Sequence, residues 1–171
     1  MPFYLKEADV LPRVAGLSSV LIVPCRFCPA ASMAVREKKP YIQLFRHFLR
    51  TEAYESFIRD LRGRLRDEGI EAVVFDSKLP HKFLPCMWTT GRRRELAKRA
   101  AEFDGVVVLG CDAAGEVVRT AMESADCRVI QGMDVEGIMS VVPTLRFPFN
   151  ISLTMQGLTP VEMQEPRAFV A

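Results

Sequence analysis

This sequence has no large excess of charge of one sign and no long apolar run, and its first residues do not resemble a secretory signal; each of these features argues against a class of protein. Lys and Arg number 23 and Asp and Glu 21, so the net charge of +2 is too small for the basic surface that nucleic-acid binding needs. No apolar stretch approaches the ~20 residues that span a bilayer. The N-terminus also lacks the basic start and apolar centre of a secretory signal. We therefore expect a cytoplasmic protein with neither nucleic acid nor a membrane as its partner.

Motifs for hydrolysis and for common phosphate sites are missing as well. The sequence has two histidines and shows no Ser-His-Asp arrangement, carboxylate pair or zinc-protease helix, so hydrolysis is not indicated. It contains neither a P-loop nor the G-x-G-x-x-G fingerprint of dinucleotide-binding domains. A reaction class cannot be assigned from any of these motifs, and whether the chain is an enzyme stays open.

The composition that is present is that of one globular domain. Of 171 residues, 49% are apolar and 26% are charged. A chain of this size can bury a substantial hydrophobic core without disulfides or structural metals. We expect residues 1–16 to form an N-terminal arm and 17–156 a single α/β domain. Residues 157–171 form a C-terminal tail, either loose or a dimer contact.

Short apolar runs alternate with stretches of helical period, a pattern typical of a parallel sheet covered on both sides. The fold class expected is α/β, a three-layer sandwich with a mostly parallel five-stranded sheet, flavodoxin-like or Rossmann-like. The strands are predicted at 17–23, 70–75, 105–110, 127–131 and 149–155, and the helical stretches at 41–68, 92–103, 115–124 and 135–142.

Four of the five cysteines follow the ends of predicted strands. Cys25 and Cys28 follow the first strand, Cys86 lies in the loop after the second, and Cys111 follows the third. In the strand order 2-1-3-4-5 these ends meet at the switch point where ligands bind. Four thiolates suit iron, zinc or an iron–sulfur cluster. The alternative is that several merely fill core space, as we expect for Cys127, which opens the fourth strand.

The turn that contains Cys111 is a second candidate for ligand binding. In "GCDAAGEVV", Gly110, Asp112 and Gly115 surround the start of a predicted helix, whose backbone N–H groups would suit a phosphate or carboxylate. The alternative is a tight turn in which Asp112 caps the helix.

A third candidate is the basic segment "TTGRRRELAKR". Arg92 and Arg93 lie in the first helical turn, where the helix dipole disfavours positive charge, so an anionic cofactor or acidic partner would explain them. Trp88 beside them would cover an aromatic cofactor or a cluster. The alternatives are a solvated helix face and a packing tryptophan. His81, in the loop that also contains Cys86, is a further candidate metal ligand that could replace one of the thiolates.

The cysteine segments also resemble a known family. "VPCRFC" (23–28), "LPC" (84–86) and "FDGVVVLGCD" (103–112) are similar to the small iron-sulfur (delta) subunit of methyl-viologen-reducing hydrogenase, which delivers electrons to heterodisulfide reductase. The family has a further cysteine soon after the Gly-Cys pair, where this chain has "DAAGEVV". The resemblance implies a [2Fe-2S]-type site and electron transfer between larger partners.

The function expected is an iron-sulfur or other metal-binding electron-transfer accessory protein, with Cys25, Cys28, Cys86 and Cys111 as ligands of a cluster or of zinc. Its partner would be a larger redox protein, and a homodimer is left open. One alternative is a metal-free, flavodoxin-like domain that binds a small anionic ligand, with Cys25 and Cys28 as a reversible dithiol. The other is a protein-interaction module.

Overall fold

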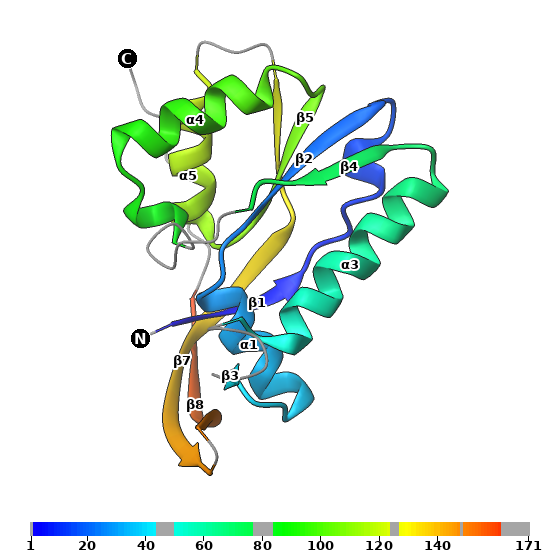
Figure 1. The fold of residues 1–171 in the computed structure, drawn as a ribbon. Helices are drawn as coiled ribbons and strands as arrows, with labels where there is room; N and C mark the ends of the chain where they lie inside the picture. The colour runs from blue at the N-terminus through cyan, green and yellow to red at the C-terminus, as the bar shows by residue number, and fades with distance from the viewer. Residues whose placement is uncertain (1, 44–49, 77–83, 124–126, 148, 162–171) are drawn as a thin grey trace.

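The computed structural model describes residues 2–43, 50–76, 84–123, 127–147 and 149–161. Within this part of the chain, the strands form two four-stranded sheets, one parallel and one antiparallel (Figure 1).

The parallel sheet carries the candidate site. Its strand order is β4-β2-β5-β6, so the first strand of this sheet in the chain, β2, lies between the second and the third. The strand β5 is buried along its whole length, in agreement with its uninterrupted apolar sequence. The four strands are β2 (Ser19–Pro24), β4 (Glu71–Val74), β5 (Gly105–Leu109) and β6 (Arg128–Gln131).

The antiparallel sheet has the order β1-β7-β8-β3 and is dominated by one long hairpin. In this hairpin, β7 and β8 pair from Gly137 opposite Pro160 to Arg146 opposite Asn150. The strands are β1 (Phe3–Glu7), β3 (Ile42–Gln43), β7 (Met133–Arg146) and β8 (Asn150–Pro160).

The prediction of a single, mostly parallel five-stranded sheet is wrong. The segment 135–142, predicted to be helical, belongs to β7, and the last predicted strand pairs with β7 instead of joining the parallel sheet. A fifth parallel strand would need a crossover connection of a dozen or more residues, usually a helix. Here the chain passes through Gly132 alone from β6 into β7, and a hairpin follows.

Gly132 allows this direct passage between the sheets. A Cβ at this position would lie 2.8 Å from a methyl carbon of Leu109 and 3.2 Å from the carbonyl oxygen of Val108. Because Cβ atoms do not approach neighbours this closely, the backbone can cross here only without a side chain.

Helices cover the sheets, and two of them follow strands that end at the candidate site. The helix α1, which periodicity did not predict, begins at Cys28, and α5 begins after Cys111. None of the described helices is both long and apolar enough to cross a membrane. The helices are α1 (Cys28–Glu37), α3 (Glu52–Asp67), α4 (Thr90–Ala100) and α5 (Asp112–Ala121), with 3-10 turns η1 (Pro12–Val14) and η3 (Pro85–Met87).

One hydrophobic core joins the two sheets. Leu5 of β1 and Met133 of β7 belong to the same buried cluster as Leu21 of β2 and Val107 of β5. Tyr54 of α3 is among the largest side chains in this cluster and is fully buried. The antiparallel sheet is therefore packed into the same body as the parallel sheet.

Candidate functional site

The candidate site lies at the carboxyl edge of the parallel sheet, between β2 and β5. Cys25 directly follows β2, and its backbone N–H donates a hydrogen bond of 2.8 Å to the Leu109 carbonyl at the end of β5. Cys111 follows two residues after Leu109. The strand order reverses between these two strands, which is where ligands bind in open parallel sheets.

Gly110 lets the two cysteine-bearing turns approach each other. A Cβ at position 110 would lie 3.2 Å from the Cβ of Cys25 and 2.7 Å from that of Ala114. This contact explains the glycine by packing, without a ligand.

Cys25 is the most enclosed of the four cysteines, with 2% of its surface exposed. Burial raises the pKa of its thiol to about 12, and the N–H groups of Phe27 and Cys28 offset part of this effect. The charges of Cys111 and Cys86 raise the pKa further.

Cys28 and Cys111 are in direct contact. The Cys28 thiol donates a hydrogen bond to the Cys111 sulfur, which raises the pKa of Cys28 and lowers that of Cys111 to about 6. Cys111 is the N-cap residue of α5, and its side chain makes no formal capping hydrogen bond. The N–H groups of Ala114 and Ala113 nevertheless favour its thiolate. The proton therefore stays on Cys28, and its hydrogen bond stabilises the thiolate form of Cys111.

Cys86 lies in η3, which contacts α5, and is exposed. Partial burial raises the pKa of its thiol, and the charge of Cys111 adds to this effect. Each of the four cysteines thus interacts electrostatically with at least one of the others, and Cys111 interacts with all three. However, among the described residues no three Cys, His, Asp or Glu side chains are arranged so that they could hold a metal ion. The sulfurs would have to move together to form a metal site.

Cys127, the fifth cysteine, lies apart from this group. Cys127 immediately precedes β6, at the amino end of its strand, and packs against the hydrophobic core. The carboxyl ends of the strands, where the other cysteines lie, are at the opposite edge of the sheet. His81 lies outside the described residues.

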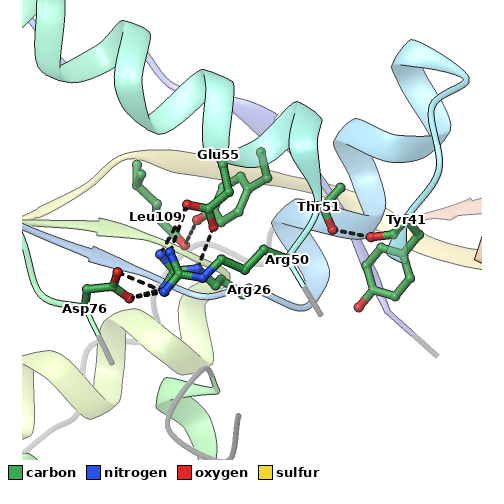
Figure 2. A network of polar contacts seen from close by, with 8 residues as sticks. Arg26, Tyr41, Arg50, Thr51, Glu55, Asp76 and Leu109 are labelled. Carbon is green, nitrogen blue, oxygen red and sulfur yellow. Dashed lines mark hydrogen bonds and ion pairs between the residues drawn. The ribbon is translucent and has the colours of Figure 1, made fainter. Parts of the chain in front are cut away.

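A network of ion pairs fixes the loop between Cys25 and Cys28 (Figure 2). The side chain of Arg26 is only 4% exposed, and its Nε lies 2.7 Å from Oε1 of Glu55 on α3. Its Nη1 lies 3.3 Å from Oδ1 of Asp76, which follows β4. Burial disfavours the Arg26 cation, but the hydrogen bond and charge of Glu55 and the charge of Asp76 outweigh it and raise the pKa. Arg50 completes the network with contacts to both carboxylates.

Sequence reasoning missed this network. Its four members are dispersed between positions 26 and 76 and share no spacing that would indicate contact. The one available signal is Asp76, a carboxylate placed directly after the end of a predicted strand, at the same sheet edge as the cysteines.

The structure accounts for Arg92 and Trp88 by contacts within the protein. The guanidinium carbon of Arg92 lies 3.9 Å from the centre of the Phe75 ring, and its Nη1 lies 2.7 Å from Glu95. Trp88 packs edge-on against Phe75, with ring centres 5.6 Å apart. This cluster anchors the segment that follows Cys86. For Arg93, the buried Nε makes no hydrogen bond within the described part of the chain.

The turn residues after β5 also have structural explanations. Asp112 is the exposed first residue of α5 and does not cap the helix, because the N-cap is Cys111. A Cβ at Gly115 would lie 2.5 Å from Oε1 of Gln131 on β6, so the glycine lets α5 approach the sheet.

No family model, curated protein or solved structure matches the chain.

Proposed function

We propose that the chain is an electron-transfer accessory protein in which Cys25, Cys28, Cys86 and Cys111 hold an iron–sulfur cluster, with zinc as the alternative metal. The observation that carries this proposal is the gathering of four thiols from three separate segments at one sheet edge. Four sulfur ligands are the donor set of iron–sulfur clusters and of structural zinc.

Backbone N–H groups around the sulfurs support this proposal. They face Cys25 from Phe27 and Cys28, and they face Cys111 from Ala114 and Ala113. Such donors favour thiolates, the form that binds metal, and they adjust the reduction potential of iron–sulfur sites. When bound, a cluster would supply one-electron chemistry.

Other residues of the site hold the segments that carry the cysteines in place. Arg26, clamped between α3 and the end of β4, restricts the loop that holds Cys25 and Cys28. The Phe75–Trp88 packing restrains the segment that carries Cys86. Because several thiols have raised pKa values, loading the site would release protons, and affinity for metal would increase with pH.

Substitution of each cysteine by serine tests this function. Cys127→Ser is the matched control, because Cys127 lies at the opposite edge of the sheet. We expect Cys25→Ser, Cys28→Ser, Cys86→Ser and Cys111→Ser to lower the bound iron and sulfide, measured in protein purified without oxygen, and Cys127→Ser to retain both. Full metal content in Cys86→Ser would exclude the four-cysteine site. This variant is the clearest test of the four, because Cys86 is the most exposed and its substitution disturbs the packing least.

The contact between Cys28 and Cys111 favours a second candidate function, thiol–disulfide exchange without metal. The Cys111 thiolate would attack a substrate disulfide and release one thiolate. Cys28, losing its proton, would then attack the mixed disulfide, so that a Cys28–Cys111 disulfide forms and the second substrate thiol leaves. This function predicts a metal-free protein with a disulfide between Cys28 and Cys111, and it tolerates Cys86→Ser.

A further inference from the structure

The β7–β8 hairpin ends in a turn at one extremity of the molecule (Figure 1). Its strands pair as far as Arg146 opposite Asn150, and Phe147 and Phe149 belong to the turn. On the outer edge of β7, pairing with β1 stops at Ile138. On the outer edge of β8, the strand β3 is only two residues long. The hairpin therefore presents a narrow end rather than a broad sheet face.

The side chains at this narrow end are apolar and exposed. Phe147 is 93% exposed, Leu145 71% and Phe149 52%, and we call these three residues the apolar tip. Contact of large apolar side chains with water is unfavourable, so exposed apolar residues that lie together mark a surface that meets an apolar medium or partner.

Positive charge lies beside the apolar tip. Arg146 stands between two members of the tip in the sequence and is the only charged residue from 137 to 161. Together with Lys38 and Lys39, at the end of α1, it lines a cavity of about 380 Å³ beside β8. Three cations around one cavity repel a further cation and attract an anion.

Acidic residues compensate only part of this charge. The Nζ atom of Lys39 lies 2.7 Å from Oε2 of Glu37, and the charge of Glu52 also acts on Lys39. Lys38 and Arg146 form no ion pair within the described part of the chain. Two cations beside the apolar tip are therefore left to interact with an anion.

The cavity also offers hydrogen bonds to an anion. Ser152 and Thr154 of β8 line it, and hydroxyl groups donate hydrogen bonds to phosphate oxygens, as do the side chains of Lys and Arg. Two uncompensated cations and two hydroxyl groups are suited to a phosphate group.

Two residues of this region have a left-handed backbone. Lys38 has a φ of 53° and Phe149 a φ of 61°, and no other non-glycine residue in the described part of the chain has a positive φ. Glycine or asparagine is usual at such positions, because a Cβ disfavours this conformation. The backbone therefore does not explain a lysine at the C-cap of α1 or a phenylalanine in the turn, which is consistent with a role for their side chains.

The surface of an anionic lipid bilayer fits this combination. Aromatic and apolar side chains enter the boundary between the headgroups and the acyl chains, while neighbouring cations pair with the lipid phosphates. A protein partner fits less well, because three residues at a turn provide less than the roughly 800 Å² that each partner buries in a specific interface. The sequence-based expectation of no membrane partner considered only spanning segments, which a surface-bound hairpin does not need.

We propose that the β7–β8 hairpin docks this chain onto the surface of an anionic bilayer, with the apolar tip in the interface and Lys38 and Arg146 on lipid phosphates. The proposal is independent of metal binding by the cysteines. Cys28 begins α1 and Lys38 follows its end, so the ten residues of the helix separate the two sites by about 15 Å.

Flotation of the full chain with lipid vesicles tests this docking. Vesicles of phosphatidylcholine with about 30% of the anionic lipid phosphatidylglycerol are compared with vesicles of phosphatidylcholine alone. The wild-type chain should float with the anionic vesicles, and its binding should weaken with added salt and without the anionic lipid. Phe147→Ala should lower the partition coefficient at least about tenfold, because the ring no longer enters the interface. Arg146→Gln and Lys38→Gln should each lower it about fivefold on the anionic vesicles.

Val142→Ala is the matched control. Val142 is an apolar residue of β7 that is 48% exposed, but it lies nearer the body of the molecule than the apolar tip does. Its substitution should leave vesicle binding unchanged. Circular dichroism checks that the variants fold, which we expect because Phe147 and Arg146 are exposed.

A wild-type chain that does not bind anionic vesicles would overturn the proposal. Equal effects of Phe147→Ala and Val142→Ala, or equal binding to both kinds of vesicle, would also overturn it. The same holds if sedimentation shows a dimer that Phe147→Ala dissociates while vesicles bind neither protein, because the tip would then contact a second copy of the chain instead of a bilayer.

Discussion

Removal of the Cys28 thiol should convert Cys111 from a thiolate to a thiol at neutral pH. The hydrogen bond from Cys28 is the largest cause of the lowered pKa of Cys111, which is about 6 against an ordinary 9.0. At pH 7 a thiol of this pKa is about nine-tenths ionised, whereas one at the ordinary value is about 1% ionised. In Cys28→Ala the N–H groups of Ala114 and Ala113 remain, but burial opposes them. We therefore expect the ionised fraction at pH 7 to fall below about half.

The assay is alkylation of the reduced, metal-free protein by iodoacetamide as a function of pH, with mass spectrometry to follow the peptide that contains Cys111. The midpoint of the rate profile gives the pKa. The rate itself is a weaker measure, because a thiolate of higher pKa is intrinsically more nucleophilic. Cys127→Ala is the control, since it removes a thiol at the other edge of the sheet. A midpoint that stays near 6 in Cys28→Ala would refute the reasoning.

The same shift has a consequence for stability. Because folding lowers the pKa of Cys111, its thiolate stabilises the fold above the unfolded value near 9, and this contribution is lost as the pH falls through about 6. Cys25 has the opposite sign, since its raised pKa stabilises the fold below pH 9 and the contribution is lost as the pH rises toward 12.

Three further substitutions test the packing around the site by urea denaturation. Glu55→Gln should lower the free energy of unfolding by about 2 kcal/mol, because it removes the carboxylate nearest the buried Arg26 cation; an unchanged midpoint would contradict the clamp. Tyr54→Phe should cost only about 1 kcal/mol, because the Leu109 carbonyl that it leaves still accepts another backbone hydrogen bond. A decrease in the free energy of unfolding of more than about 3 kcal/mol would show that the Leu109 carbonyl is left without a hydrogen bond. Gly110→Ala should cost about 2 kcal/mol by overpacking the two turns, and a stabilised variant would show that they are not in contact.

The strands of the parallel sheet and the helices α3, α4 and α5 could be predicted from the sequence, although the helical stretch expected at 41–68 starts too early, because Ile42–Gln43 form β3. The segment "GVVVL" (105–109) is apolar without alternation, as expected for a strand buried on both faces. The stretch that contains α3 repeats apolar residues every three or four positions and ends before Gly69, whose φ of +78° suits glycine.

The antiparallel sheet could not be read in this way. The segment "VEGIMSVV" (135–142) is a short apolar run whose periodicity does not separate a strand from a helix. Its conformation is decided by pairing with β8 on one edge and with β1 on the other, and both partners are distant in the sequence or lie beyond a turn.

The candidate site was likewise only partly accessible from the sequence. The position of the cysteines at one edge of the sheet could be predicted, because the carboxyl ends of parallel strands lie at the same edge. The orientation of their side chains could not be predicted in this way. The contact of Cys28 with Cys111 depends on Gly110 and on the start of α1, which no periodic pattern announced. The ion pairs of Arg26 could not be predicted from the sequence, because its partners come from α3 and from the end of β4.

The measurement that tests the central claim most directly is an absorption spectrum with iron, zinc and sulfide analysis of the wild-type protein purified without oxygen. The account predicts a coloured protein with broad visible bands that contains iron and sulfide in equal amounts. One equivalent of zinc without iron would keep the four cysteines as ligands and exclude electron transfer. A colourless protein free of both metals would contradict the metal site.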